Sequence, residues 1–155
     1  MNLRTSLRAL YLASGAVSAL LVTTTAASAA SFAMKTTAFN LDGYAGAQGT
    51  VTFLDSDSIR ISSQVADHCG DGTGDGEGAY LWAEITYTDG SVDGGHTISA
   101  NWDNDGCDNG TKPATTVTLN PGRAIKKVRM RLDEADGPSN PSETVYSAWM
   151  DNPAT

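Results

Sequence analysis

The feature of the sequence that most restricts its fold is a two-residue alternation of apolar and polar side chains in short segments separated by Gly, Asn and Asp. In the segment 79–88, for example, Leu81, Ala83 and Ile85 share one face. Successive side chains of a β-strand point to opposite faces of a sheet, so this alternation predicts half-buried strands. The clearest segments are 49–54, 58–66, 79–88, 115–120 and 124–132, and weaker candidates are 34–41, 96–102 and 144–149.

These segments follow one another through short turns, and each has one polar face, which is typical of antiparallel sheets. After residue 29, no long window has apolar residues at the i, i+3, i+4, i+7 spacing of an amphipathic helix. We therefore expect an all-β fold, an antiparallel two-sheet sandwich or a jelly roll of about eight strands.

The first 29 residues have the order of a secretory signal peptide. Two arginines precede an uncharged apolar run over 9–22, and small residues ending in an Ala-x-Ala pattern at Ala29 follow. The run is shorter than the roughly 20 residues that a membrane-spanning helix needs, and the order is typical of an export signal cut after Ala29. We expect residues 1–29 to make few contacts with the fold, and residues 30–155 to form one secreted, extracellular domain with no membrane span.

The mature chain would be strongly acidic. Loss of Arg4 and Arg8 with the signal reduces the ten basic residues to eight against 18 acidic ones, a net charge of about −10. Such a charge repels phosphate backbones, so nucleic acid is not expected as a partner. It also favours solubility outside the cell, and we expect a monomer.

The sequence contains two cysteines, Cys69 and Cys107. An even number of cysteines in an exported chain predicts a disulfide, and closing this loop would stabilise the fold by roughly 4 kcal/mol on the chain-entropy model. A metal site is the alternative, but two thiols at this separation, with His68 and His96 as the histidines, match no zinc spacing. We therefore predict a Cys69–Cys107 bond.

Each cysteine lies in a loop rich in Asp and Gly, over 67–78 and 101–110, and residues 61–111 contain no Lys or Arg. Calcium binds carboxylate and carbonyl oxygens of such loops, so one hypothesis is a calcium site that both loops share. The alternative is that Asp, Asn and Gly form turns; the second loop has Lys112 where an EF-hand loop has its twelfth, acidic residue. The candidate calcium ligands are Asp71, Asp75, Glu77, Asp103, Asp105 and Asp108.

A basic stripe, Lys127, Arg129 and Arg131, alternates along one predicted strand. It is either a solvated sheet face, paired with acids such as Glu84 on a neighbouring strand, or a patch for anionic polymers such as the teichoic or polysaccharide acids of a cell wall. A cross-strand pair of the first kind contributes roughly 0.2–1 kcal/mol.

Aromatic residues are a third candidate feature, because their rings bind sugars by stacking. Tyr80 and Trp82 fall on the face opposite Leu81, and Tyr146 and Trp149 lie near the C-terminus. Packing accounts for most buried Trp and Tyr. Trp102, at the edge of the second acidic loop, is the residue that we expect to be exposed and to stack on a ligand.

Three motifs carry a resemblance to known proteins. Residues 67–69 have the pattern D-x-C, residues 75–80 the pattern D-G-x-G-A-Y, and Asp151-Asn152-Pro153 is a terminal D-N-P. In these motifs the chain resembles a group of small secreted bacterial β-sandwich proteins of unknown function, over most of its mature length. The resemblance implies secretion and a disulfide, and it implies no activity. Further cysteines of that group, near Asp133 and in the following loop, are absent here.

The sequence contains neither a Gly-x-Ser-x-Gly elbow nor a His-Glu-x-x-His motif. We therefore expect no catalytic residue and no certain cofactor, with calcium as the one candidate. The favoured function is a non-catalytic extracellular module that binds a cell-wall glycan or a protein through the two acidic loops. A small hydrolase with loop carboxylates, or a secreted inhibitor or toxin, is the alternative. A cleft with two carboxylates would favour the hydrolase, a protruding rigid loop the inhibitor, and a flat face with an exposed Trp a carbohydrate module.

Overall fold

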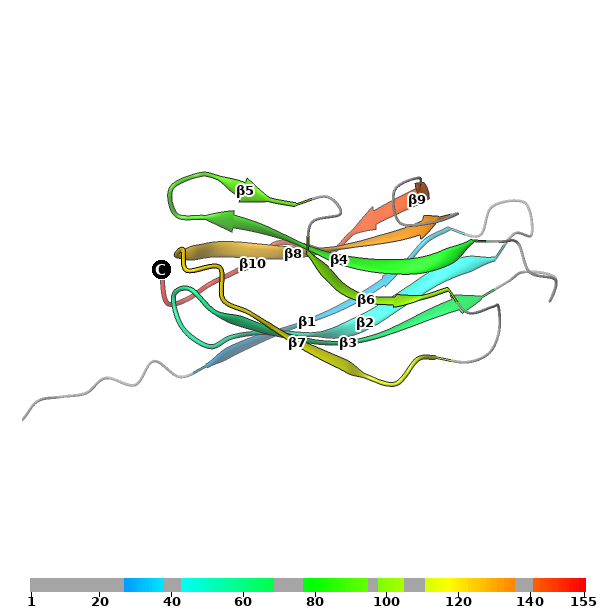
Figure 1. Ribbon diagram of the computed structural model, residues 1–155, viewed down its shortest axis with the longest axis horizontal. Coiled ribbons are helices and arrows are strands. Elements are labelled where there is room, and N and C mark those ends of the chain that lie inside the picture. Colours follow the sequence, from blue (N-terminus) through cyan, green and yellow to red (C-terminus); the bar gives the residue numbers. More distant parts are fainter. Residues whose placement is uncertain (1–26, 38–42, 69–76, 95–97, 105–110, 136–140) are drawn as a thin grey trace, which may run out of the picture.

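A computed structural model describes residues 27–37, 43–68, 77–94, 98–104, 111–135 and 141–155. These residues form β-strands in two antiparallel sheets, one of four strands and one of six, which pack face to face (Figure 1). The expected all-β, two-sheet sandwich is therefore confirmed. Within this described part, no helix is long and apolar enough to cross a membrane.

The four-stranded sheet has the order β1-β2-β3-β7. Its strands are β1 (Ser28–Lys35), β2 (Tyr44–Phe53), β3 (Ile59–His68) and β7 (Thr115–Leu119). In the view of Figure 1 this sheet is the lower layer.

The six-stranded sheet is built around two long, paired strands, β4 (Gly78–Tyr87) and β8 (Ile125–Ala135). The second edge of β4 pairs with β6 (Ser99–Asp103) and β5 (Val92–Asp93) at different heights, and the second edge of β8 pairs with β9 (Pro141–Tyr146) and β10 (Met150–Asp151). The sheet is therefore four strands wide, with β4 and β8 at its centre.

Inward side chains of both sheets form one apolar core, because every second residue of each long strand points toward the other sheet. Full burial of one Val, Leu, Ile, Phe or Met side chain stabilises the fold by roughly 1.5–3 kcal/mol. The most buried members include Val51, Ile59, Ile61, Leu81, Ile85, Val128, Met130 and Leu132.

The N-terminal strand differs from the expectation. Strand β1 begins at Ser28, where the alternation had suggested a strand from residue 34, and Ser28 and Ala29 pair with Phe53 and Thr52 of β2. The expectation that residues 1–29 make few contacts is therefore wrong for these two residues, while residues 1–26 lie outside the described part of the chain. The first residues of β1, Ser28 to Ser31, are all small, so they show no clear alternation of apolar and polar side chains.

The other predicted strands are confirmed, but several have shifted ends; β2, for example, begins at Tyr44 where the alternation predicted a strand from residue 49. Strand β6 covers Ser99–Asp103 and β9 covers Pro141–Tyr146, against predictions of 96–102 and 144–149. Strands β5 and β10 were not predicted, because two residues are too few to show an alternation.

Strands β3 and β6 end side by side at one end of the sandwich. The backbone N–H of Asp67, near the end of β3, donates to Oδ2 of Asp103, at the end of β6, over 3.3 Å. Nearby, Nδ2 of Asn101 donates to the backbone oxygen of Ser63 over 3.1 Å. A Cys69–Cys107 bond requires these two strands to end together, and they do. Both cysteines lie outside the described residues, so the bond itself stays a prediction.

Candidate functional site

The candidate site is the outer face of the six-stranded sheet, the face turned away from the four-stranded sheet. Since Leu81, Val128 and Met130 point into the core, the alternate residues of β4 and β8 point outward. Directly paired residues share a face of the sheet, so the register extends this face to the edge strands. Its aromatic and basic members are Tyr80, Trp82, Trp102, Lys127, Arg129, Arg131, Tyr146 and Trp149.

Arg129 lies at the centre of this face, between an acid and two aromatic rings. Its Nε donates to Oε2 of Glu84, its cross-strand partner on β4, over 2.6 Å. Its Cζ lies 4.1 Å from the ring centroid of Tyr146 and 4.7 Å from that of Trp149. Both distances are within the range of cation–π attraction. The predicted pairing of the basic stripe with Glu84 is therefore confirmed.

Arg131 is held by a second acid on its own strand. Its Nε donates to Oδ1 of Asp133 over 2.8 Å, and the hydroxyl of Thr144 donates to the same oxygen over 2.6 Å. The Asp133 side chain is 1% exposed. A buried carboxylate with a guanidinium partner and a hydroxyl donor is held rigidly, so this network gives the face a defined shape.

Two large aromatic residues of β4 are covered on this same face. Tyr80 and Trp82 form a small buried cluster with Ala135, separate from the main core. The hydroxyl of Tyr80 accepts a hydrogen bond from Nδ2 of Asn104 over 3.4 Å. Burial on the outer face as well as the inner one explains why β4 is buried along nearly its whole length.

Within the described part of the chain, the exposed large apolar side chains lie on the outer face. Among the described residues they are Val92, 59% exposed, Trp102, 56%, and Tyr146, 45%. Trp102 pairs with Tyr80, Tyr146 with Arg131, and Val92 with Thr86. Three strand spacings separate β6 from β9, so Trp102 and Tyr146 stand roughly 15 Å apart across the sheet. The predicted exposure of Trp102 is confirmed.

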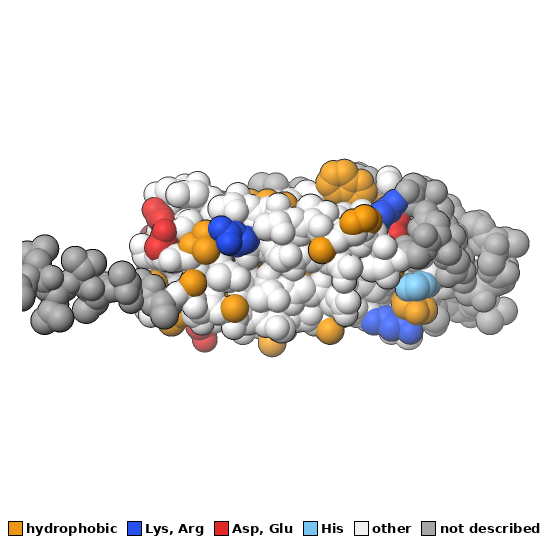
Figure 2. Space-filling view, turned by 90° about the horizontal axis from the view of Figure 1, so that it is seen from below, with side chains coloured by type: hydrophobic (Ala, Val, Ile, Leu, Met, Phe, Trp, Pro, Cys, Tyr) orange, Lys and Arg blue, Asp and Glu red, His pale blue; other side chains and the backbone are white. Residues whose placement is uncertain are grey.

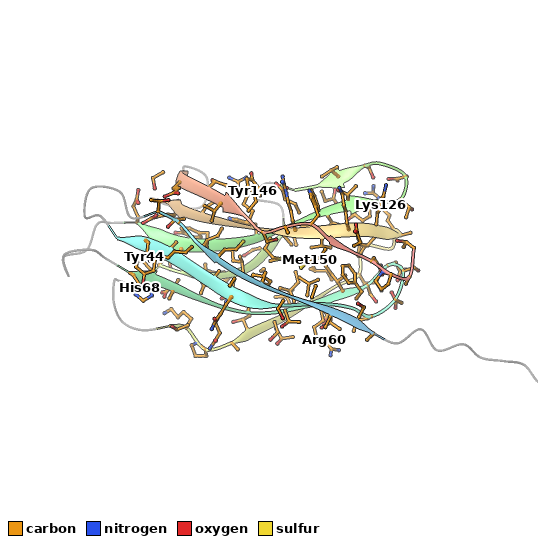
Figure 3. The ribbon with its side chains drawn as sticks, turned by 180° about the vertical axis from the view of Figure 1, so that it is seen from behind. Tyr44, Arg60, His68, Lys126, Tyr146 and Met150 are labelled. Atoms are coloured by element: carbon orange, nitrogen blue, oxygen red, sulfur yellow. The ribbon has the colours of Figure 1, made fainter. Side chains whose placement is uncertain are left out.

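The opposite face of the sandwich is chemically different. Figure 2 looks onto the four-stranded sheet, where small and uncharged side chains dominate. A row of hydroxyl residues, Ser31, Thr50, Ser62 and Thr116, crosses its four strands in register. The aromatic exception is Tyr44, whose ring lies 4.5 Å from that of His68 (Figure 3). The Lys35 ammonium lies 3.4 Å from the centroid of the Tyr44 ring. The exposed aromatic rings are therefore concentrated on the outer face.

Two of the six predicted calcium ligands belong to the described part of the chain. Oε2 of Glu77 accepts a hydrogen bond from the hydroxyl of Ser142 over 2.9 Å. The buried Asp103 pairs with Lys112, with Oδ1 and Nζ 3.6 Å apart. In that part, no three acidic, histidine or cysteine side chains converge as a metal site. The other candidates, Asp71, Asp75, Asp105 and Asp108, lie outside it, so the calcium site stays a hypothesis.

The hairpin that carries Val92 is anchored by a buried tyrosine. The hydroxyl of Tyr87 donates to Oδ2 of Asp93 over 2.6 Å, and Cζ of Arg123 lies 3.8 Å from the tyrosine ring centroid. Burial of the phenol, followed by its hydrogen bond to Asp93, raises the pKa of Tyr87 to about 12. Nearby, Arg123 also contacts the carboxylate of Asp89 at 3.4 Å.

This shift predicts a loss of stability at alkaline pH. Tyr87 ionises near pH 10 in the unfolded chain and near pH 12 in the folded one. The contribution of Tyr87 to the free energy of unfolding is complete below pH 10 and is lost as the pH rises toward 12. We expect this loss to be roughly 1–2 kcal/mol, less than the full pKa shift implies, because Asp93 and Arg123 are partly exposed and solvent screens their interactions. Urea unfolding of the wild type and of Tyr87→Phe at about pH 9 and about pH 12 measures it. The variant should lose less stability over this interval, and equal losses would contradict the assignment.

Sequence reasoning missed how the last residues contribute. The approach of Tyr146 and Trp149 to Arg129 depends on β9 pairing with β8, which local alternation does not reveal. The only signal in the sequence was that both rings lie close together near the C-terminus.

Comparisons of the chain with protein-family models, with curated proteins and with solved structures found no match.

Proposed function

We propose that the protein is an exported, non-catalytic module that binds a polysaccharide chain on the outer face of its six-stranded sheet. The observation that carries this proposal is the gathering of the exposed apolar side chains, Trp102, Tyr146 and Val92, on that one face. Indole and phenol rings offer a flat apolar surface with a polar edge, which matches the C–H face and the hydroxyl rim of a sugar ring.

The arrangement of the face suits a chain better than a small molecule. Trp102 and Tyr146 lie on opposite edge strands, so a ligand that contacts both must extend across the sheet. Between them, the rings of Tyr80 and Trp82 are buried. The side chains of Arg129 and Arg131 are held by ion pairs, so they lose little conformational entropy when a ligand binds.

The same ion pairs on the outer face favour binding over hydrolysis. A glycosidase needs one carboxyl group to donate a proton and a second carboxylate to act as base or nucleophile. On the outer face the carboxylates of Glu84 and Asp133 each already bind a guanidinium group, that of Arg129 and that of Arg131 respectively. We therefore favour a binding module over the alternative of a hydrolase at this face.

The test is equilibrium binding of the secreted protein to a panel of soluble polysaccharides. We expect Trp102→Ala and Tyr146→Ala each to weaken binding about tenfold, which is about 1.4 kcal/mol. Since Trp102 is exposed, its removal should change the free energy of unfolding by less than about 0.5 kcal/mol. Removal of Tyr146 also removes its contact with Arg129 and should cost up to about 1 kcal/mol.

The matched control is Tyr44→Ala, which removes an aromatic ring from the other sheet. It should leave polysaccharide binding unchanged. Binding that both outer-face variants retain in full would contradict the proposed site, and failure to bind any polysaccharide would contradict the proposed function.

A further inference from the structure

The basic residues of the outer face differ in how well their charges are matched. Arg131 pairs with Asp133, and Arg129 pairs with Glu84 through Nε. Lys127 forms no ion pair with any described residue; its ammonium instead lies 4.3 Å from the ring centroid of Trp149. The unmatched positive charge of this face is therefore concentrated at Lys127.

Lys127 and Arg129 border the same indole ring. The Lys127 Nζ and the Arg129 Cζ lie 4.3 Å and 4.7 Å from the centroid of Trp149. Within the described residues, the one hydrogen bond that the Arg129 side chain donates is from Nε to Glu84, which leaves its terminal nitrogens for a ligand. An ammonium and a guanidinium edge beside one ring form a cationic cluster that favours an anion.

We infer that the polysaccharide is acidic, and that Lys127 and the terminal nitrogens of Arg129 bind the carboxylate of a uronic acid unit. This inference rests on the proposed function. A planar carboxylate matches the guanidinium edge, and its sugar ring would lie against Trp149 or Tyr146. Phosphate-bearing polymers are the competing anionic ligand, and the test below separates the two.

The acidity of the whole protein does not oppose such a ligand at short range. Six of the eight basic residues after position 29 lie between residues 112 and 131, whereas ten of the acids lie between residues 61 and 111. At physiological ionic strength charges are screened over about 8 Å. The ligand therefore experiences mainly the groups around Lys127, among them the exposed Asp151, its cross-strand neighbour, with which it forms no ion pair.

The chain supplies a matched control beside the proposed subsite. Lys126 is exposed and is skipped by the register between β4 and β8, where Thr86 pairs with Lys127 and Tyr87 with Ile125. Figure 3 labels Lys126 on β8 and Tyr146 on β9. Lys126→Gln and Lys127→Gln thus remove the same charge from adjacent positions, and one of the two positions borders Trp149.

The experiment measures the affinity of the full protein for polygalacturonate and for its fully methyl-esterified form, in which the carboxylates are neutral. We expect Lys127→Gln to weaken binding of polygalacturonate about tenfold and to leave binding of the ester unchanged, with less than twofold effect from Lys126→Gln. The wild-type affinity should also fall more steeply with added salt than that of Lys127→Gln.

Equal effects of the two lysine variants, or equal wild-type affinity for the acid and the ester, would overturn the inference. Tighter binding of polyglycerol phosphate than of polygalacturonate would overturn the assignment of the anion as a carboxylate. These outcomes leave the proposed function intact, provided that Trp102→Ala still weakens binding of the ester. If Trp102→Ala and Tyr146→Ala leave both polymers bound, the proposed function itself fails.

Discussion

Replacement of Gly49 by alanine is expected to lower the free energy of unfolding by about 3 kcal/mol, the upper part of the range for overpacking a core. Gly49 lies in β2 between Phe32 of β1 and Ser63 of β3. A Cβ atom there would stand 2.2 Å from the backbone oxygen of Ser62 and 2.9 Å from Cζ of Phe32. The nearer atom belongs to the backbone of the adjacent strand, so strands β2 and β3 would have to separate locally.

Urea unfolding monitored by circular dichroism measures this change, and Gly46→Ala is its control in the same strand. A Cβ at Gly46 would meet its nearest neighbours, the backbone oxygen of Ala66 and Cε2 of Tyr44, at 3.9 Å and 4.0 Å. We expect that substitution to be neutral or to stabilise by up to about 1 kcal/mol, because alanine restricts the unfolded chain. Similar losses for both variants would show that the close packing at Gly49 is not the cause.

Replacement of Asn152 by alanine is expected to cost about 3 kcal/mol. The buried Asn152 donates from Nδ2 to the backbone oxygens of Asp55 and Ile125, over 3.0 Å and 3.1 Å, and its Oδ1 accepts from the backbone N–H of Ala154 over 3.0 Å. It thereby links the turn between β2 and β3 to the start of β8 and to the C-terminus. Removing the amide leaves these groups without their partner, which costs roughly 1–3 kcal/mol per buried group.

Thermal unfolding followed by near-ultraviolet circular dichroism would measure this loss. The control is Asn120→Ala, which removes an exposed amide whose Oδ1 accepts from the N–H of Gly122 within a turn. That change should cost less than about 1 kcal/mol. If the two variants were equally stable, Asn152 would not connect the sheets as its hydrogen bonds indicate. The result also bears on the terminal D-N-P motif, to which the structure gives a role in packing.

Much of the architecture was predictable because strand alternation is a local property. The clearest alternating segments each became a strand, and Leu81, Val128 and Met130 entered the core as their positions indicated. The outward direction of Arg129 and its pairing with Glu84 followed from the same pattern. Strand β1 was harder to place because small side chains give hydrophobic alternation little contrast, and its start overlaps the end of the proposed signal.

The candidate site was only partly predictable. The exposure of Trp102 was inferred from its acidic neighbours and is confirmed. The acidic loops were favoured as the binding surface on composition alone, and most of their candidate ligands lie outside the described residues. The candidate binding surface in the structure is instead the outer face of the six-stranded sheet, which is formed by residues that are distant in the sequence.

The sequence by itself determined the class of fold, the faces of the strands and the separation of acidic from basic segments, because each depends on neighbours within a few residues. The tertiary structure alone decided that β9 and β6 lie at opposite edges of the β4–β8 pair. Strand order and register are set by packing between distant segments, and a shift of one residue would turn every side chain to the other face. That pairing is what brings Tyr146 and Trp149 to Arg129 and places Trp102 across the same surface.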